Sequence, residues 1–130
     1  MVRSSRLPSI TGRRGTIGEN EAARHLTKQG LRILLRNVRV GPGEIDLVCR
    51  HGNILVMVEV KSRQIGGWER PSEAVDQRKR RILLQSTDAY LQELGHPEIN
   101  VRFDIVEVGL RGDQVVDIQW IPSAFDSKGR

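Results

Sequence analysis

The pair Gly52-Asn53 constrains the fold of this chain more than any other short feature of its sequence. Stretches of alternating apolar and polar residues flank the pair, and Gly-Asn between such stretches is typical of a two-residue β-hairpin turn. The pattern predicts strands at 44–51 and 54–63, paired so that the numbers of opposed residues sum to about 105. A turn at His51-Gly52 is the alternative, and it would slide one strand along the other.

The predicted pairing brings charged residues together at one end of the hairpin. Asp46 lies directly opposite Glu59, and there the two Cβ atoms would be about 4.5–5.5 Å apart. Glu44 lies opposite Lys61 on the same face. In the alternative pairing Glu59 is diagonal to Asp46, which a long side chain can still bridge. Two opposed carboxylates repel each other unless a cation or a proton lies between them.

The rest of the hairpin has the pattern of an ordinary core. Alternation predicts one apolar face made of Ile54, Val56, Val58 and Val60, which meets Ile45, Leu47 and Cys49. The opposite face carries Leu55, Met57, Glu59 and Lys61. The polar residues therefore gather at one end of an otherwise apolar hairpin.

Carboxylates in this arrangement can hold a hard divalent cation. Oxygen ligands from Asp46, Glu59 and the backbone carbonyl of Val60 would favour Mg²⁺ or Mn²⁺ over zinc. Lys61 beside them could act on a phosphate or on a water molecule. Spacing alone leaves a second interpretation open, in which Glu44 pairs with Lys61 on a solvated sheet face and the acids face water.

Glu19 is a third acidic candidate. The run Thr16-Ile17-Gly18-Glu19 has the form of a capping box, and it would open a helix from Thr16 to Gln29 that stops at Gly30. Capping by itself explains a carboxylate in a first helical turn. If this helix packs across the sheet near Asp46, Glu19 could instead add a metal ligand or orient a water molecule.

The remaining pattern completes a mixed α/β domain. A strand is expected at 31–40, and a second long helix, with Asp76 as its N-cap, ends at Gly95-His96-Pro97. Strands at 101–108 and 115–121 follow. The resulting order is αβββαββ, a mixed central sheet flanked by helices.

Composition favours one domain that binds a polyanion. The chain has 130 residues, a net charge of +5 and a pI of about 10.1. We expect nucleic acid as the partner rather than a membrane, because no basic amphipathic anchor is evident. No apolar run approaches the roughly 18–20 residues that span a bilayer. The single Cys49 excludes an internal disulfide and suits the cytoplasm. The expected organisation is a basic flexible tail at 1–14, one domain at 15–126 and a short tail at 127–130.

Consecutive basic residues open the second long helix: Arg78, Lys79, Arg80 and Arg81. Positive charge at a helix N-terminus opposes the helix dipole, and a bound phosphate would relieve that cost. We expect these side chains, together with Arg63, to contact nucleic acid. The alternative is a solvated run of charge.

Several motifs taken together resemble one family. They are Gly15-x-x-Gly18-Glu19, Arg36-Asn37, Gly43-Glu44-Ile45-Asp46-Leu47, Val58-Glu59-Val60-Lys61-x-Arg63, Glu73-Ala74-Val75 with Lys79, Arg102-Phe103-Asp104 and Ala124-Phe125. In this order, from about Gly15 to Phe125, they resemble the YraN-like family of uncharacterised bacterial proteins. That family is similar to the PD-(D/E)XK, restriction-endonuclease-like superfamily and to archaeal Holliday-junction resolvases.

The resemblance implies a three-layer, restriction-endonuclease-like α/β fold and a nuclease site. Asp46 and Glu59 are its implied metal ligands, Lys61 its active-site lysine and Glu19 the acid of its first helix. It implies an Mg²⁺-dependent endonuclease that acts on DNA in preference to RNA, including branched recombination or repair intermediates. Because resolvases act as dimers, it also admits a homodimer. A non-catalytic nucleic-acid-binding module on the same scaffold is the alternative.

Overall fold

The computed structural model describes residues 3–4, 13–66 and 77–130. Within these ranges the helices are α1 (Arg13–Lys28) and α2 (Gln77–Glu93). The strands are β1 (Arg3–Ser4), β2 (Arg32–Val40), β3 (Gly43–His51), β4 (Ile54–Gln64), β5 (Asn100–Arg111) and β6 (Gln114–Phe125). The protein is therefore an α/β protein, as its sequence predicts.

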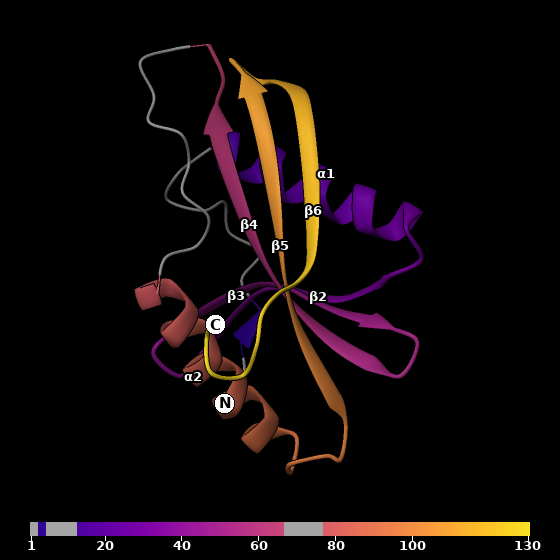
Figure 1. Ribbon diagram of the computed structural model, residues 1–130, viewed down its shortest axis with the longest axis vertical. Helices are drawn as coiled ribbons and strands as arrows, with labels where there is room; N and C mark the ends of the chain where they lie inside the picture. The colour runs from indigo at the N-terminus through magenta and orange to yellow at the C-terminus, as the bar shows by residue number, and fades with distance from the viewer. Residues whose placement is uncertain (1–2, 5–12, 67–76) are drawn as a thin grey trace.

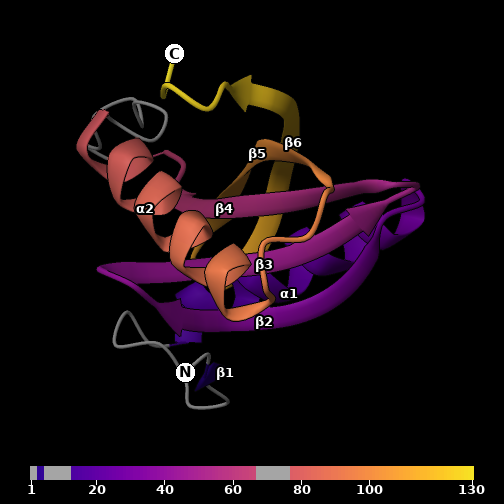
Figure 2. The same cartoon turned by 90° about the horizontal axis from the view of Figure 1, so that it is seen from below.

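The described strands form one mixed sheet in the order β1-β2-β3-β4-β5-β6. Neighbouring strands are antiparallel except β4 and β5, which run parallel because α2 lies on the connection between them. The two helices cover opposite faces of the sheet (Figures 1 and 2). Ala22 and Leu26 of α1 belong to one core cluster, and Leu83 and Tyr90 of α2 belong to the other.

The hairpin prediction is confirmed. The turn is at Gly52-Asn53, where Gly52 has a φ of 62°, and His51 pairs with Ile54 in the register whose numbers sum to 105. Val56 and Val58 lie on the α1 side with Leu47 and Cys49. Leu55 and Met57 lie on the α2 side. Glu59 continues this alternation toward α2.

Strand β3 changes faces at Asp46, which alternation alone did not predict. Leu47 lies in the α1-side cluster, whereas Ile45 lies in the α2-side cluster, so the expected grouping of Ile45 with Leu47 is wrong. Arg36 pairs with Leu47 and Val38 pairs with Ile45, which places Asn37 across from Asp46. Asn37 has a φ of 53°, a left-handed conformation that interrupts the regular pleat.

Some element boundaries differ from those expected. The capping box at Thr16 and Glu19 is wrong, because α1 already begins at Arg13 and these residues lie inside it. Gly30, with a φ of 95°, does end this helix. Arg3 and Ser4, from the segment expected to be a tail, pair with Arg39 and Val38. The expected cap Asp76 lies outside the described residues.

Helix α2 is held close to the sheet and to the C-terminal segment. Gly43 at the start of β3 lies so close to α2 that an added Cβ would collide with Cγ2 of Ile82. Arg80 donates from Nη1 to the carbonyl of Gly129 (3.2 Å), and its guanidinium lies 5.2 Å from the centre of the Phe125 ring. These contacts set the position of the first turns of α2.

No helix in the described ranges is both long and apolar enough to cross a membrane.

We predict that Gly43→Ala destabilises the protein by about 1–3 kcal/mol, because the branched Ile82 side chain has little rotamer freedom with which to avoid the new methyl group. Urea unfolding of the single variants and of Gly43→Ala/Ile82→Ala measures the effect. In the double variant the cost should be less than the sum of the single costs, because Ile82→Ala removes the colliding atom. Additive costs would contradict the close approach.

Candidate functional site

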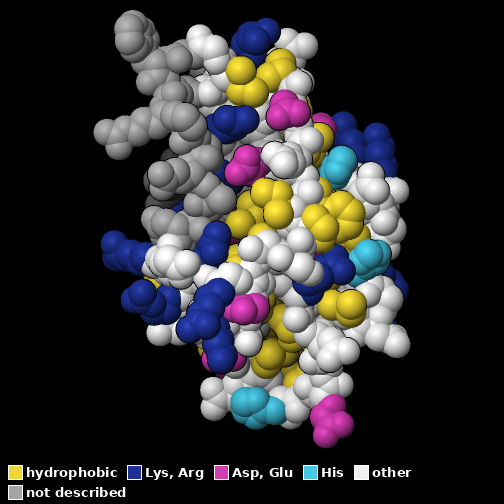
Figure 3. Space-filling model, in the orientation of Figure 1, with side chains coloured by type: hydrophobic (Ala, Val, Ile, Leu, Met, Phe, Trp, Pro, Cys, Tyr) yellow, Lys and Arg dark blue, Asp and Glu magenta, His cyan; other side chains and the backbone are white. Residues whose placement is uncertain are grey.

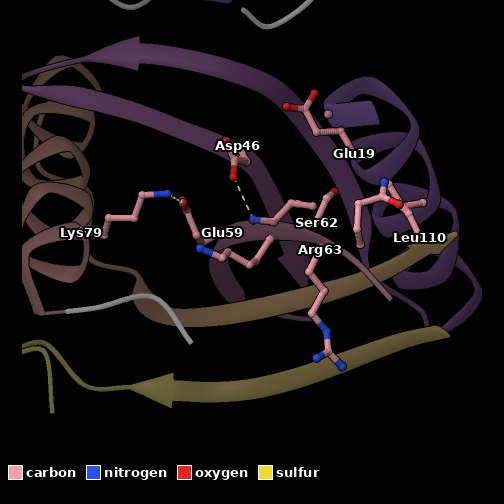
Figure 4. Close-up of a pocket in the computed structure, with 11 residues that line it drawn as sticks. Glu19, Asp46, Glu59, Ser62, Arg63, Lys79 and Leu110 are labelled. Atoms are coloured by element: carbon pink, nitrogen blue, oxygen red, sulfur yellow. Dashed lines mark hydrogen bonds and ion pairs between the residues drawn. The ribbon is translucent and has the colours of Figure 1, made fainter. Parts of the chain in front are cut away.

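A pocket of about 350 Å³ lies where β3 and β4 separate, between α1 and α2. Figure 4 shows Glu19 entering it from α1, Asp46 from β3, Glu59 from β4 and Lys79 from α2. Its lining is completed by Gly15, Val60, Lys61, Ser62, Arg63, Gln64 and Leu110. The four residues predicted as catalytic, Glu19, Asp46, Glu59 and Lys61, thus line one pocket.

Asp46 lies at the fork of the two strands. The paired residues of β3 and β4 end at Leu47 and Val58. Asp46 and Glu59, which would be the next pair, do not continue the regular ladder. Instead, the Asp46 carboxylate accepts a hydrogen bond from the backbone N–H of Val60, with an N–O distance of 2.8 Å. The side chain takes over the role of the missing backbone partner.

Asp46 and Glu59 nevertheless line the same pocket, close enough for each carboxyl group to affect the ionisation of the other. Burial, followed by the charge of Glu59, raises the pKa of Asp46 well above its usual range. Burial also raises the pKa of Glu59, although the ammonium of Lys79 opposes that shift. The pair therefore behaves as two close carboxyl groups that resist losing both protons, as the sequence argument anticipated.

The expected pairing of Glu44 with Lys61 is wrong. Glu44 is opposite Arg39 in the β2–β3 ladder, and its carboxylate lies 3.6 Å from Nε of Arg39. Glu59 is paired with Lys79, whose Nζ lies 3.3 Å from Oε1. Lys61 remains in the lining of the pocket, two residues after Glu59 on the same strand.

Glu19 is held by Asn37, not by a helix cap. The Asn37 side-chain amide donates to Oε2 of Glu19 at 3.1 Å. The pKa of Glu19 is raised, mainly by burial, while the bond from Asn37 and the charge of Arg36 act in the opposite direction. Asn37 Oδ1 is buried without a hydrogen-bond partner in the structure as described. Asn37 thus combines a left-handed backbone with a contact to the site, a combination that is common at functional positions.

The four basic residues of α2 point in different directions. Lys79 reaches Glu59, and Arg80 is turned toward Phe125 and Gly129. Arg78 and Arg81 are exposed. In Figure 3, Lys and Arg side chains gather over α2 on the face shown. Arg63 lines the pocket itself, and the expected contact of these five side chains with nucleic acid stays a prediction.

Asp104 carries a carboxylate outside the pocket, and its hydrogen bonding differs from that of Asp46 and Glu59. Asp104 accepts hydrogen bonds from the Arg102 guanidinium, from Nε1 of Trp120 and from the backbone N–H of Ser123. It is fully buried and fully partnered, as a structural acid should be. Cys49 is also buried, and burial together with the charge of Asp104 raises the pKa of its thiol to about 12. This burial agrees with the expected place of Cys49 on the apolar face of the hairpin.

Across the described ranges, no three His, Cys, Asp or Glu side chains converge closely enough to enclose a metal ion. The candidate ligands are therefore the two carboxylates of Asp46 and Glu59, with the Val60 carbonyl as the backbone ligand predicted from the sequence. Two carboxylates leave most of an octahedral shell to water and substrate, which is the usual coordination of Mg²⁺. Two close carboxyl groups whose pKa values are both raised also gain from a cation, so the residues fit such an ion.

Comparison with known proteins gives a consistent family match. The model of the uncharacterised protein family UPF0102 matches residues 18–108. A UPF0102 protein of Syntrophotalea carbinolica is 41% identical over 88% of this chain and 93% of its own length. Those of Symbiobacterium thermophilum and Anaeromyxobacter dehalogenans are 43% and 44% identical, over 89% of this chain and over 98% and 86% of their own lengths. The resemblance to the YraN-like family is confirmed by these matches.

We predict that Asp46→Asn makes the metal-free protein more stable at neutral pH. A carboxyl group whose pKa is higher in the folded protein than in the unfolded chain favours folding when protonated, and that contribution is lost as pH rises through the folded-state pKa. Asparagine cannot ionise and can still accept the Val60 N–H. In EDTA, thermal melts should show a gain on the order of 1 kcal/mol at pH 8 that shrinks toward pH 4. Asp88→Asn, at an exposed site, is the control, and an equal or opposite pH dependence there would refute the assignment.

We also predict that Asn37→Ala is less stable than Asn37→Gly by about 1 kcal/mol, because alanine at a positive φ is strained and glycine is not. Both variants lose the hydrogen bond to Glu19, so the difference between their free energies of unfolding reports the cost of the backbone conformation at position 37. Urea unfolding measures it. At exposed Gln119 in β6 the order should reverse, with alanine the more stable. The same order at both positions would contradict the strain.

Proposed function

The chain belongs to the uncharacterised protein family UPF0102, and from the geometry of its pocket we propose that it is a metal-dependent endonuclease that hydrolyses phosphodiester bonds in DNA. The observation that carries the proposal is the contact between the Asp46 and Glu59 carboxyl groups, with Lys61 two residues further along β4, in one pocket. The raised pKa values of both acids support the proposal, because two close carboxyl groups that resist ionisation gain from a bound cation.

The arrangement of elements supports a restriction-endonuclease-like fold for this activity. An acidic hairpin, a crossover helix and a parallel strand build the core of the sheet, and the two helices lie on opposite faces. Asp46 lies at the fork between β3 and β4, where its carboxylate takes the place of a strand partner for the Val60 N–H. The mixed sheet and its two helices would then be the three layers of that fold.

A divalent ion bound by Asp46 and Glu59 would supply Lewis acidity for the scissile phosphate and for the attacking water. Asp46 is oriented for this role by the Val60 N–H, which fixes one of its oxygens. Lys61 would hold a proton or donate to a phosphate oxygen as negative charge develops there. Glu19, fixed by Asn37, would accept hydrogen bonds from water near the ion.

DNA would approach from the side of α2. Arg78 and Arg81 are exposed on that helix, and Arg63 lines the pocket. Guanidinium groups contact phosphates without reading sequence, so binding should be weakened by salt and largely independent of sequence. The net charge of +5 adds to this attraction.

A second candidate is a non-catalytic DNA-binding module on the same scaffold. It is favoured by one observation, that among the described side chains fewer than three potential metal ligands converge. Such a module would bind DNA through the same basic side chains and would not need the acids.

We predict that Glu59→Gln and Lys61→Met each lower cleavage of linear, flapped or branched DNA by about 100-fold or more in Mg²⁺ or Mn²⁺, because each removes a group that acts at the reacting phosphate. Glu98→Gln, at an exposed position outside the pocket, is the matched control and should cleave normally. Gel assays on labelled substrates measure the rates.

If wild type and Glu59→Gln are equally inert on every substrate, the enzymatic proposal fails. DNA binding that is equal in EDTA and in Mg²⁺, and falls steeply with salt, would then identify the binding module.

A further inference from the structure

Lys79 is the cation that the structure places at the acid pair. Its Nζ lies 3.3 Å from Oε1 of Glu59, and the two residues come from α2 and β4. Figure 4 shows the long side chain extending from α2 to this carboxylate. From the sequence, Lys79 was expected to contact nucleic acid together with its neighbours on the helix. Its contact with Glu59 depends on the fold and was not predicted.

The pairing is unlike an ordinary surface ion pair, because its two members differ in burial. The Glu59 side chain is 13% exposed, whereas that of Lys79 is 54% exposed. The carboxylate is thus inside the site and the ammonium reaches it from the rim. Lys79 therefore compensates the charge of Glu59, the member of the acid pair that faces α2, whereas Asp46 is held by the Val60 N–H.

The same carboxylate oxygens are the ones proposed to hold a divalent ion. An ammonium group and a dication on one carboxylate repel each other over a few ångströms, and both cannot keep their best positions. Lysine has a flexible four-carbon stem and a compact charge, so its head can move away while its Cα stays in place. The head of Lys79 can move in this way while its Cα stays in place, because Lys79 lies in α2 and the neighbouring Arg80 holds that turn of the helix.

We propose that Lys79 is the resident counter-ion of the acid pair, is displaced from Glu59 by the divalent ion, and then contacts a phosphate of the bound DNA. The proposal rests on the proposed function, since it assumes that this site takes a metal and DNA. It adds a role for Lys79 that is distinct from that of Lys61. Metal binding and DNA binding become coupled, because the ion releases the cation that the phosphate uses.

The neighbours of Lys79 supply matched controls. Arg78 and Arg81 are one and two residues away on α2 and are exposed. Replacing either with methionine removes the same unit charge from the same turn of α2 and leaves the ion pair between Lys79 and Glu59 in place. A change in Mn²⁺ affinity that occurs only in the Lys79 variant therefore reports its contact with Glu59. A change shared by all three variants reports the loss of positive charge near the pocket.

The first experiment is calorimetric titration of Mn²⁺ into the full chain at pH 8 in about 0.1 M salt. Lys79→Met should bind Mn²⁺ about three- to tenfold more tightly than wild type, because the ion no longer displaces an ammonium. Arg78→Met and Arg81→Met should stay within about twofold, and Lys79→Arg, which keeps the charge, should resemble wild type. An affinity for Lys79→Met equal to that of Arg81→Met, or weaker than wild type, overturns the proposal.

The second experiment measures binding of a labelled DNA duplex by fluorescence anisotropy in Ca²⁺ and in EDTA. Lys79→Met should weaken binding in Ca²⁺ and have little effect in EDTA, where the ammonium is held by Glu59. Arg81→Met should weaken binding equally in both buffers. An equal loss in both buffers for Lys79→Met refutes the displacement step.

Failure of this inference can be separated from failure of the proposed function. If wild type binds Mn²⁺, Asp46→Ala abolishes that binding and Lys79→Met leaves it unchanged, the metal site stands and the role of Lys79 is wrong. If wild type binds no Mn²⁺ at all, the metal site itself is wrong and both proposals fall.

Discussion

The hydrogen bond from the Val60 N–H to the Asp46 carboxylate is the interaction around which the site is organised. At this point β4 leaves β3 and continues in the parallel ladder with β5. A strand that loses its neighbour exposes backbone groups, and here a carboxylate satisfies one of them. The same contact fixes Asp46 beside Glu59, so the fork of the sheet and the acid pair have a common origin.

The carboxylates of the described structure differ in how well their surroundings stabilise them. Asp104 receives donors from three residues and is fully satisfied, whereas Asp46 and Glu59 face each other with raised pKa values. A chain optimised only for stability would not retain two such groups in contact. Asn37 adds a strained backbone beside them, which places three unfavourable features around one pocket.

The local patterns in the sequence were sufficient for the hairpin, its register and the faces of β4, because a two-residue turn and alternation determine them. They were not sufficient for the change of face at Asp46, since a left-handed Asn37 breaks the alternation that the prediction assumed. Nor could they place Lys79, whose partner is 20 residues away on another element. Four consecutive basic residues lie on all sides of a helix, so their sequence alone does not indicate which side chain faces the rest of the protein.

Arg80 has a consequence for its neighbour Lys79 that concerns entropy. The guanidinium of Arg80 anchors the first turn of α2 to the Gly129 carbonyl and the Phe125 ring, so the backbone of this turn is already ordered in the folded protein. Ordering a backbone residue costs roughly 1–2 kcal/mol, and here that cost is met by folding. When Lys79 changes partners, only its side-chain torsions need to reorganise. Phe125 and Gly129 therefore lower the entropic cost of a movement made by the neighbouring side chain of α2.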